Sequence, residues 1–135
     1  MKWFLWRIGR VTEIRMRFAD GIEIRAVLFL KPTETVRKLE EVLPFTSTVH
    51  RWGDEIYFEA PFHAGLESNA RADMDVGDVA FWPDGDAIAV FFGRTPASAD
   101  ERPRAYSPCN IVGRVLEDVA VLRRIKEGAK VEVLA

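Results

Sequence analysis

The chain has 135 residues and 48% of them are hydrophobic, which is enough for one domain with a sizeable core. Its formal net charge of −2 gives no electrostatic reason to expect nucleic acid or an anionic membrane as a partner. The single cysteine, Cys109, excludes an internal disulfide and a metal cage built from several cysteines. The chain has no Gln and only two Asn, and 30% of its residues are charged, a composition typical of thermophile proteins.

An aromatic run opens the chain, in which Trp3, Phe4 and Trp6 lie close together. Because charged residues interrupt this run, it is too short for a signal peptide or a membrane span, and we expect a cytoplasmic protein. Residues 1–11 are therefore predicted to form an N-terminal extension or an extra edge strand. The alternative is a contact between identical chains, since clustered exposed aromatic side chains usually mark an interaction site.

Residues 12–29 are predicted to form a β-hairpin. Apolar Ile14, Met16 and Phe18 alternate with charged neighbours, which is the pattern of a strand with one buried face. A following Asp-Gly pair provides the residues that a tight turn favours, and the alternation then resumes.

Residues 33–43 have the features of an α-helix. Thr33 is a good N-cap, and Pro44 ends the segment. The apolar residues fall on one face at helical spacing: Val36, Leu39 and Leu43. This stripe is expected to belong to the core.

Residues 45–62 combine a cation, carboxylates and aromatic side chains around a predicted turn between two strands. Two interpretations remain open. In one, Arg51 forms an ion pair across the strands with Glu55 or Glu59, and Trp52 covers the end of a barrel. In the other, these residues converge on a small cleft, since charged and aromatic side chains together are typical of ligand-binding sites.

The middle of the chain is predicted to form a loop, a hairpin and a second loop. Residues 63–76 are polar and are predicted to be a surface loop or a short extra strand. Residues 79–92 are predicted to be a hairpin around a Pro-Asp-Gly-Asp turn, and the second arm is apolar enough to be buried on both faces. Residues 94–108 contain three prolines and are predicted to be a long loop, which either covers a cleft or only keeps the surface soluble.

The end of the chain is predicted to be a strand that leads directly into a helix. Ile111 and Val112 belong to the strand, and residues 119–126 form the helix, with Leu122 and Ile125 on one face. Residues 130–134 would then form the last strand.

Ordered motifs in the chain resemble a short, atypical cyclophilin-like family of largely uncharacterised archaeal and bacterial proteins. The motifs are Trp52 to Phe58, Trp82 to Gly85, Phe91 to Pro96, and Ser107 to Arg114. Residues 111–125 also resemble the closing strand and helix of cyclophilins. The resemblance implies a mainly β fold in which residues 12–135 form a single domain, a closed cyclophilin-like barrel with two α-helices capping its ends. The biochemical role of this family is not established.

The same resemblance points to a candidate catalytic residue. Cyclophilins are peptidyl-prolyl cis-trans isomerases in which an Arg after the first helix contacts the amide of the bound proline, and Arg51 stands at the corresponding place. Phe91 or Phe92 matches the Phe that floors the proline pocket, and Cys109 stands where cyclophilins have a pocket His. Glu59 replaces the Gln that holds the substrate backbone. Because an ionised Glu cannot donate the hydrogen bond of Gln and can pair with Arg51, efficient isomerisation is not expected.

The sequence therefore predicts a binding module whose cleft holds an unknown peptide or small ligand. The candidate ligand-binding residues are Trp52, Glu55, Tyr57, Glu59, Phe91, Phe92, Tyr106 and Asn110. The alternatives are a prolyl isomerase that uses Arg51 and a structural protein that oligomerises through its aromatic N-terminus. No cofactor is expected, and no metal site is predicted, because the spacing of His50, His63 and Cys109 matches no recognised zinc site.

Overall fold

The computed structural model describes residues 13–30 and 32–135. The strands are β1 (Glu13–Phe18), β2 (Glu23–Leu28), β3 (Phe45–Thr48), β4 (His50–Arg51), β5 (Glu55–Glu59), β6 (Arg71–Asp73), β7 (Asp78–Trp82), β8 (Ala87–Phe91), β9 (Arg104–Val115) and β10 (Lys130–Leu134). The helices are the α-helix α2 (Glu34–Val42) and the 3₁₀ helices η1 (Pro83–Gly85) and η2 (Val119–Arg124). The expected edge strand and intermolecular contact at residues 1–11 lie outside the described residues. In the described ranges no helix is both long and apolar enough to cross a membrane.

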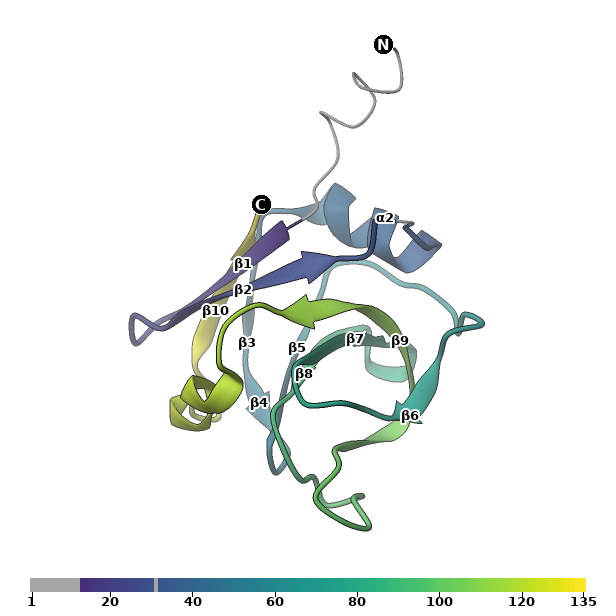
Figure 1. Cartoon of the computed structure of the whole chain (residues 1–135). Coiled ribbons are helices and arrows are strands. Elements are labelled where there is room, and N and C mark those ends of the chain that lie inside the picture. Colours follow the sequence, from purple (N-terminus) through teal and green to yellow (C-terminus); the bar gives the residue numbers. More distant parts are fainter. Residues whose placement is uncertain (1–12, 31) are drawn as a thin grey trace.

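The strands form one strongly curled antiparallel sheet (Figure 1). Its order is β3-β10-β1-β2-β9-β7-β8-β5-β4, and β6 pairs with β9 beside this path. The mainly β fold is thus confirmed. The two end strands, β3 and β4, are joined in the chain by Val49 alone, but within the described residues no hydrogen-bonded pairing closes the sheet between them. Closure of the barrel therefore stays a prediction.

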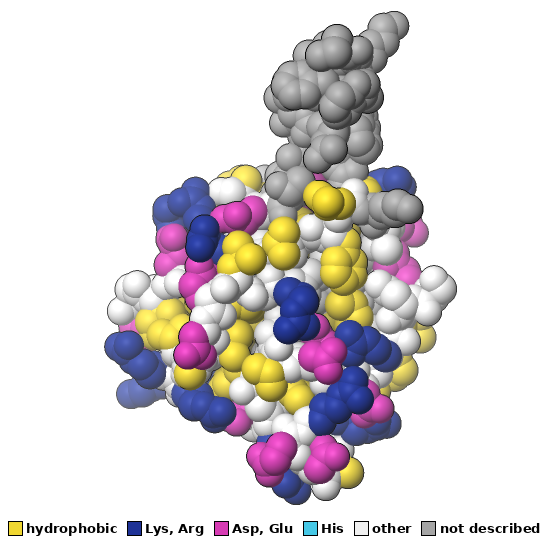
Figure 2. Space-filling model, viewed as in Figure 1, with side chains coloured by type: hydrophobic (Ala, Val, Ile, Leu, Met, Phe, Trp, Pro, Cys, Tyr) yellow, Lys and Arg dark blue, Asp and Glu magenta, His cyan; other side chains and the backbone are white. Residues whose placement is uncertain are grey.

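The first hairpin has the predicted form. β1 and β2 pair in antiparallel register, with Met16 opposite Ile24, and alternate apolar side chains of both strands are buried in the main core, whereas Val27 lies on the outer face. The charged side chains alternate with them and face outward, where Arg17 and Glu23 form an ion pair at 2.6 Å. On the face shown in Figure 2, acidic and basic side chains are interspersed.

Both predicted helical segments contribute to the main core. In α2 the side chain of Thr33 accepts a hydrogen bond from the N–H of Val36 at 3.3 Å, as expected of the N-cap, and Leu39 is fully buried. The segment after β9 differs from the prediction, because η2 is a 3₁₀ helix. Leu122 of η2 and Ile125, the C-cap residue that follows it, are both buried in the main core.

The predicted loop over residues 94–108 is wrong in its last third. Residues from Arg104 onward belong to β9, where Arg104 pairs with Asp73 and Cys109 pairs with Arg71 of β6. The short extra strand that was one of the two options for residues 63–76 is therefore real. It gives the start of β9 a partner for its backbone hydrogen bonds.

Two apolar clusters lie on opposite faces of β8. The main core contains Ile88 and Val90, and a smaller cluster contains Ala89 and Phe91. Successive side chains of a strand point to opposite faces, so both faces of β8 are covered. All residues of the strand are buried, which confirms the prediction for this arm of the hairpin.

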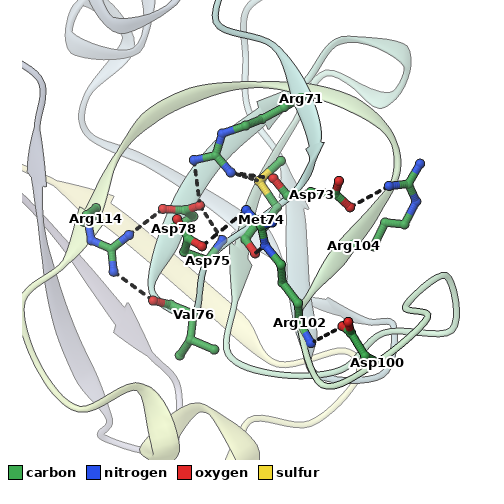
Figure 3. A network of polar contacts seen from close by, with 10 residues as sticks. All are labelled: Arg71, Asp73, Met74, Asp75, Val76, Asp78, Asp100, Arg102, Arg104 and Arg114. Carbon is green, nitrogen blue, oxygen red and sulfur yellow. Dashed lines mark hydrogen bonds and ion pairs between the residues drawn. The ribbon is translucent and has the colours of Figure 1, made fainter.

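An ion-pair network joins β6 to β7 and β9 (Figure 3). Asp78 is buried at the start of β7, and its two carboxylate oxygens accept hydrogen bonds from Arg71 at 3.1 Å and from Arg114 at 2.7 Å. The backbone N–H of Asp75 also donates to Asp78, at 2.7 Å. The network therefore holds one carboxylate between β6 and β7, which are close in the sequence, and the distant strand β9.

The strand pair β2–β9 is close enough at one position to require glycine. A Cβ built on Gly113 would collide with the carbonyl oxygen of Val27 and lie 3.2 Å from the Cα of Leu28. Because backbone atoms cannot turn aside, Gly113→Ala is expected to lower the free energy of unfolding by about 1–3 kcal/mol. Urea denaturation measures this change. Gly65→Ala is the control, since a Cβ there meets nothing within 4 Å, and an equal effect of both substitutions would contradict the prediction.

Candidate functional site

A small pocket lies against the face of the sheet that carries the smaller apolar cluster. It has a volume of about 140 Å³, and we call it the aromatic pocket. Its lining residues come from the turn after β4, from β5, from the end of β7 and from β9: Trp52, Glu55, Tyr57, Trp82, Ala105, Tyr106 and Cys109. The pocket thus joins segments that only the sheet topology brings together.

Four aromatic rings form a continuous series around this pocket. Tyr106 contacts Trp52 and Trp82 at centroid distances of 6.1 and 6.2 Å, with interplanar angles of 73° and 75°. Tyr57 contacts Trp82 at 6.1 Å and 80°. Edge-to-face pairs of this kind are favourable beyond the area that they bury. Neighbouring rings are therefore nearly perpendicular to each other. Tyr106 lies on the solvent side of the pocket, with 76% of its surface exposed.

The indole of Trp82 is held in place on two sides. Its Nε1–H donates a hydrogen bond to the hydroxyl of Ser107 at 2.7 Å. The backbone of Gly85 lies so close to the ring that a Cβ at that position would come within 2.5 Å of two indole atoms. A ring fixed in this way loses little further freedom when a ligand binds.

Glu55 is the acidic side chain of the pocket. In β5 the alternation of side chains directs Ile56 and Phe58 into the main core, so Glu55 and Tyr57 face the other way. Glu55 is only 7% exposed, and its Oε1 atom has no hydrogen-bond partner among the described residues. Burial raises the pKa of Glu55 to about 8, because the ionised form loses its hydration. The carboxyl group is therefore largely protonated at neutral pH when the pocket is empty.

Cys109 lines the same pocket but is not poised for nucleophilic attack. Burial raises the pKa of its thiol to about 12, with smaller contributions from the charges of Glu55 and Asp84. The thiolate is the reactive form of cysteine, so this side chain acts as a small apolar group.

Arg51 does not line the aromatic pocket. Its guanidinium donates hydrogen bonds to the backbone carbonyls of Gly53 at 3.0 Å, Ile125 at 2.8 Å and Arg123 at 3.2 Å. It lies over the ring of Phe92, 5.1 Å from the centroid. Of the two open interpretations, the one in which Arg51 pairs with Glu55 or Glu59 does not match the structure, since its carboxylate partner is Asp54, at 3.7 Å. Arg51 thus ties the turn after β4 to the end of η2.

The structure brings together only some of the candidate ligand-binding residues. Trp52, Glu55, Tyr57 and Tyr106 line the aromatic pocket. Glu59 is exposed and lines a separate polar groove, and Phe91 and Phe92 are buried in the two apolar clusters. Asn110 is fully buried and has a structural role. Its amide donates hydrogen bonds to Thr35 and to the carbonyl of Gly65, and its oxygen accepts one from the N–H of Glu67.

Sequence reasoning missed three residues of the pocket: Trp82, Ala105 and Cys109. A signal for Trp82 was present, because it starts one of the family motifs and an aromatic residue before a tight turn is well placed to cover a sheet. Cys109 also carried a signal, because it stands where cyclophilins have a pocket His. Ala105 carried none, since it falls in residues 94–108, which were predicted to be a loop. Within the described ranges, His, Cys, Asp and Glu side chains do not gather in groups of three that would hold a metal ion.

Comparisons with known proteins agree with this architecture. A family model described as cyclophilin-like matches residues 12–134. The solution structure of a hypothetical protein from Archaeoglobus fulgidus is similar to this chain, with 37% sequence identity and a TM-score of 0.76, and the similarity covers 91% of this chain and 93% of that chain. No curated protein matches the chain. Because the family model spans nearly the whole sequence and the solved relative has the same fold, the chain belongs to the cyclophilin-like family.

Proposed function

We propose that this chain is a binding module that holds a peptide or a small ligand in the aromatic pocket and does not isomerise prolyl bonds efficiently. The observation that carries the proposal is that the buried side chain of Glu55 lines one pocket together with four aromatic side chains. A concave, mainly apolar site with one well-placed polar group is the usual form of a small-ligand site. The fixed position of Trp82 supports the same conclusion, because a preformed site lowers the entropic cost of binding.

The position of Arg51 argues against a prolyl isomerase. An isomerase must lower a barrier of about 18–20 kcal/mol, and it does so by stabilising the twisted amide with a donor aimed at the proline nitrogen. Backbone carbonyls of this chain already accept hydrogen bonds from the guanidinium of Arg51. Glu59, which stands where cyclophilins carry their Gln, faces a different groove.

A protease-coupled assay on proline tetrapeptides tests this part of the proposal. We expect turnover indistinguishable from the uncatalysed rate, with an ordinary cyclophilin as the positive control. Arg51→Ala is expected to lower the free energy of unfolding instead, since it removes charge-assisted hydrogen bonds worth about 1.5–3 kcal/mol each. Turnover near that of the control enzyme, abolished by Arg51→Ala in a protein that still folds, would establish the isomerase.

Binding itself is tested by nuclear magnetic resonance titration with a panel of proline peptides, aromatic acids and organic cations. A ligand of the pocket should shift the indole N–H signal of Trp82 and the amide signals of Tyr57 and Tyr106. The proposal fails if every member of the panel leaves these signals unchanged.

We also propose that the sheet forms the closed barrel typical of cyclophilins. Backbone hydrogen bonds from Val49 to Ala129 and from Gly128 to Val49, both at 2.8 Å, support this. They hold the one residue between β3 and β4 against the segment before β10, so the ends of the sheet approach each other.

A further inference from the structure

We propose, resting on the binding function above, that the aromatic pocket binds the alkylated ammonium group of an organic cation, with the carboxylate of Glu55 as its counter-ion. The four rings and the single carboxyl group supply the two interactions that such a group needs.

The rings provide the cation–π part. Two of the four are Trp, the aromatic side chain that attracts cations best, and the other two are Tyr. Their near-perpendicular contacts, at 73° to 80°, build adjoining walls instead of a single stacking surface. A flat ligand needs a single stacking surface, whereas a roughly spherical trimethylammonium group gains from aromatic rings on several sides. Aromatic cages of this kind recognise quaternary ammonium groups in proteins.

Glu55 provides the charge. It is more than nine-tenths buried, it lines the pocket, and among the described residues its Oε1 atom accepts no hydrogen bond and no basic side chain pairs with it. An ionised carboxylate buried without a cationic partner is costly, so a cation in the pocket would compensate its charge. Burial raises the pKa of Glu55 to about 8, and a cation in the pocket would favour the ionised form.

The size of the pocket limits the part of the ligand that enters. Its volume of about 140 Å³ is well below the roughly 300–1,000 Å³ of sites for drug-sized ligands. It is close to the roughly 150 Å³ of a cavity that accepts a benzene ring. The pocket therefore takes a headgroup, and the remainder of the ligand lies outside past Tyr106, whose side chain is mostly exposed.

An unmodified lysine ammonium fits this site less well. A primary ammonium is compact and strongly hydrated, and Glu55 is the one acidic side chain in the pocket lining to replace its water. An alkylated ammonium has few hydrogen-bond donors to satisfy and presents methyl groups to the rings, so the pocket selects it over lysine.

The matched test compares choline with its neutral isostere 3,3-dimethylbutan-1-ol, at constant ionic strength set with sodium chloride. The indole N–H signal of Trp82 and the tryptophan fluorescence report on the pocket. We expect choline to bind at least about tenfold more tightly than the neutral alcohol, because only the cation gains the cation–π and ionic contributions. Equal affinity of the two compounds would overturn the proposal.

Three variants identify the residues responsible. Glu55→Gln is expected to weaken choline binding about tenfold or more. Tyr106→Ala is expected to weaken it as well, and this change at an exposed side chain leaves the core intact. Glu59→Gln is the control, since Glu59 lies on the same strand but outside the pocket, and it should bind choline as the unmodified chain does. Unchanged binding by Glu55→Gln would contradict the proposed counter-ion.

Two sources could present this headgroup, a free small molecule or a trimethylated lysine in a peptide. Choline represents the first, and a short peptide with trimethyllysine represents the second, with the unmethylated peptide as its control. Tighter binding of the methylated peptide than of choline would identify a peptide partner, and the reverse would identify a small molecule.

If no cation binds but a proline peptide shifts the Trp82 signal, the cation proposal is wrong and the binding function stands. If no probe shifts it, both are wrong.

Discussion

Glu55→Gln is expected to make the stability of this protein far less dependent on pH. Burial raises the pKa of Glu55 from 4.5 to about 8, so between these values the folded state holds a proton that the unfolded state has released. The contribution of Glu55 to stability is therefore fully present below pH 4.5 and is lost as the pH rises toward 8. One unit of pKa corresponds to about 1.4 kcal/mol. The contribution of Glu55 to the free energy of unfolding therefore falls by roughly 4 kcal/mol between pH 5 and pH 9.

Urea denaturation at pH 5, 7 and 9 measures this effect. Gln resembles the neutral form of Glu, so the stability difference between the variant and the unmodified chain should shift by roughly 4 kcal/mol in favour of the variant as the pH rises. Burial raises the pKa of Cys109 from 9.0 to about 12, so this thiol lowers stability only as the pH reaches 9 and above, and it is present in both proteins that are compared. Glu59→Gln, a change at an exposed position of the same strand, should show no such shift. Parallel stability curves for Glu55→Gln and the unmodified chain would contradict the burial of the carboxyl group.

Asp78→Ala is expected to lower the free energy of unfolding by about 3 kcal/mol. The side chain of Asp78 is only 2% exposed, and it accepts hydrogen bonds from two arginines and from the N–H of Asp75 (Figure 3). Removing it breaks the link between β6, β7 and β9. The arginine side chains remain 38% and 50% exposed and can be hydrated again, which keeps the loss at the lower end of values for buried ion pairs.

The control for Asp78→Ala is a second aspartate in the same network. Asp73 pairs with Arg104 at 2.6 Å, but its side chain is 57% exposed. Exposed ion pairs contribute at most about 1 kcal/mol, so Asp73→Ala should change the urea midpoint only slightly. If the two substitutions cost the same, the network depends on surface charge and not on the buried carboxylate.

Local patterns in the sequence were sufficient for most of the elements. Alternating apolar residues predicted the hairpin of β1 and β2, because a strand with one buried face must have that period. The N-cap Thr33 and its apolar stripe predicted α2 for the same kind of reason. η2 was predicted as an α-helix because an apolar spacing of three residues suits both helix types, and only packing against the core distinguishes them.

The candidate site was predictable only in part. Trp52, Glu55 and Tyr57 are close together in the sequence around one turn, so their convergence could be expected. Trp82 and Cys109 join them because β7 and β8 pair, β5 and β8 pair, and β9 lies on the other side of β7. Arg51 could not be assigned from sequence, since its partners are backbone carbonyls more than seventy residues away as well as one nearby.

The sequence by itself determined the mainly β fold, the family and several of the residue types that line the aromatic pocket. These depend on periodicity, turn residues and motifs, which act over short stretches of chain. The tertiary structure decided which of those residues share a pocket, and it buries the Oε1 atom of Glu55 without a hydrogen-bond partner among the described residues. Strand pairings between distant segments fix those relations, and the loss of water around Glu55 arises only when β5, β7 and β9 have come together.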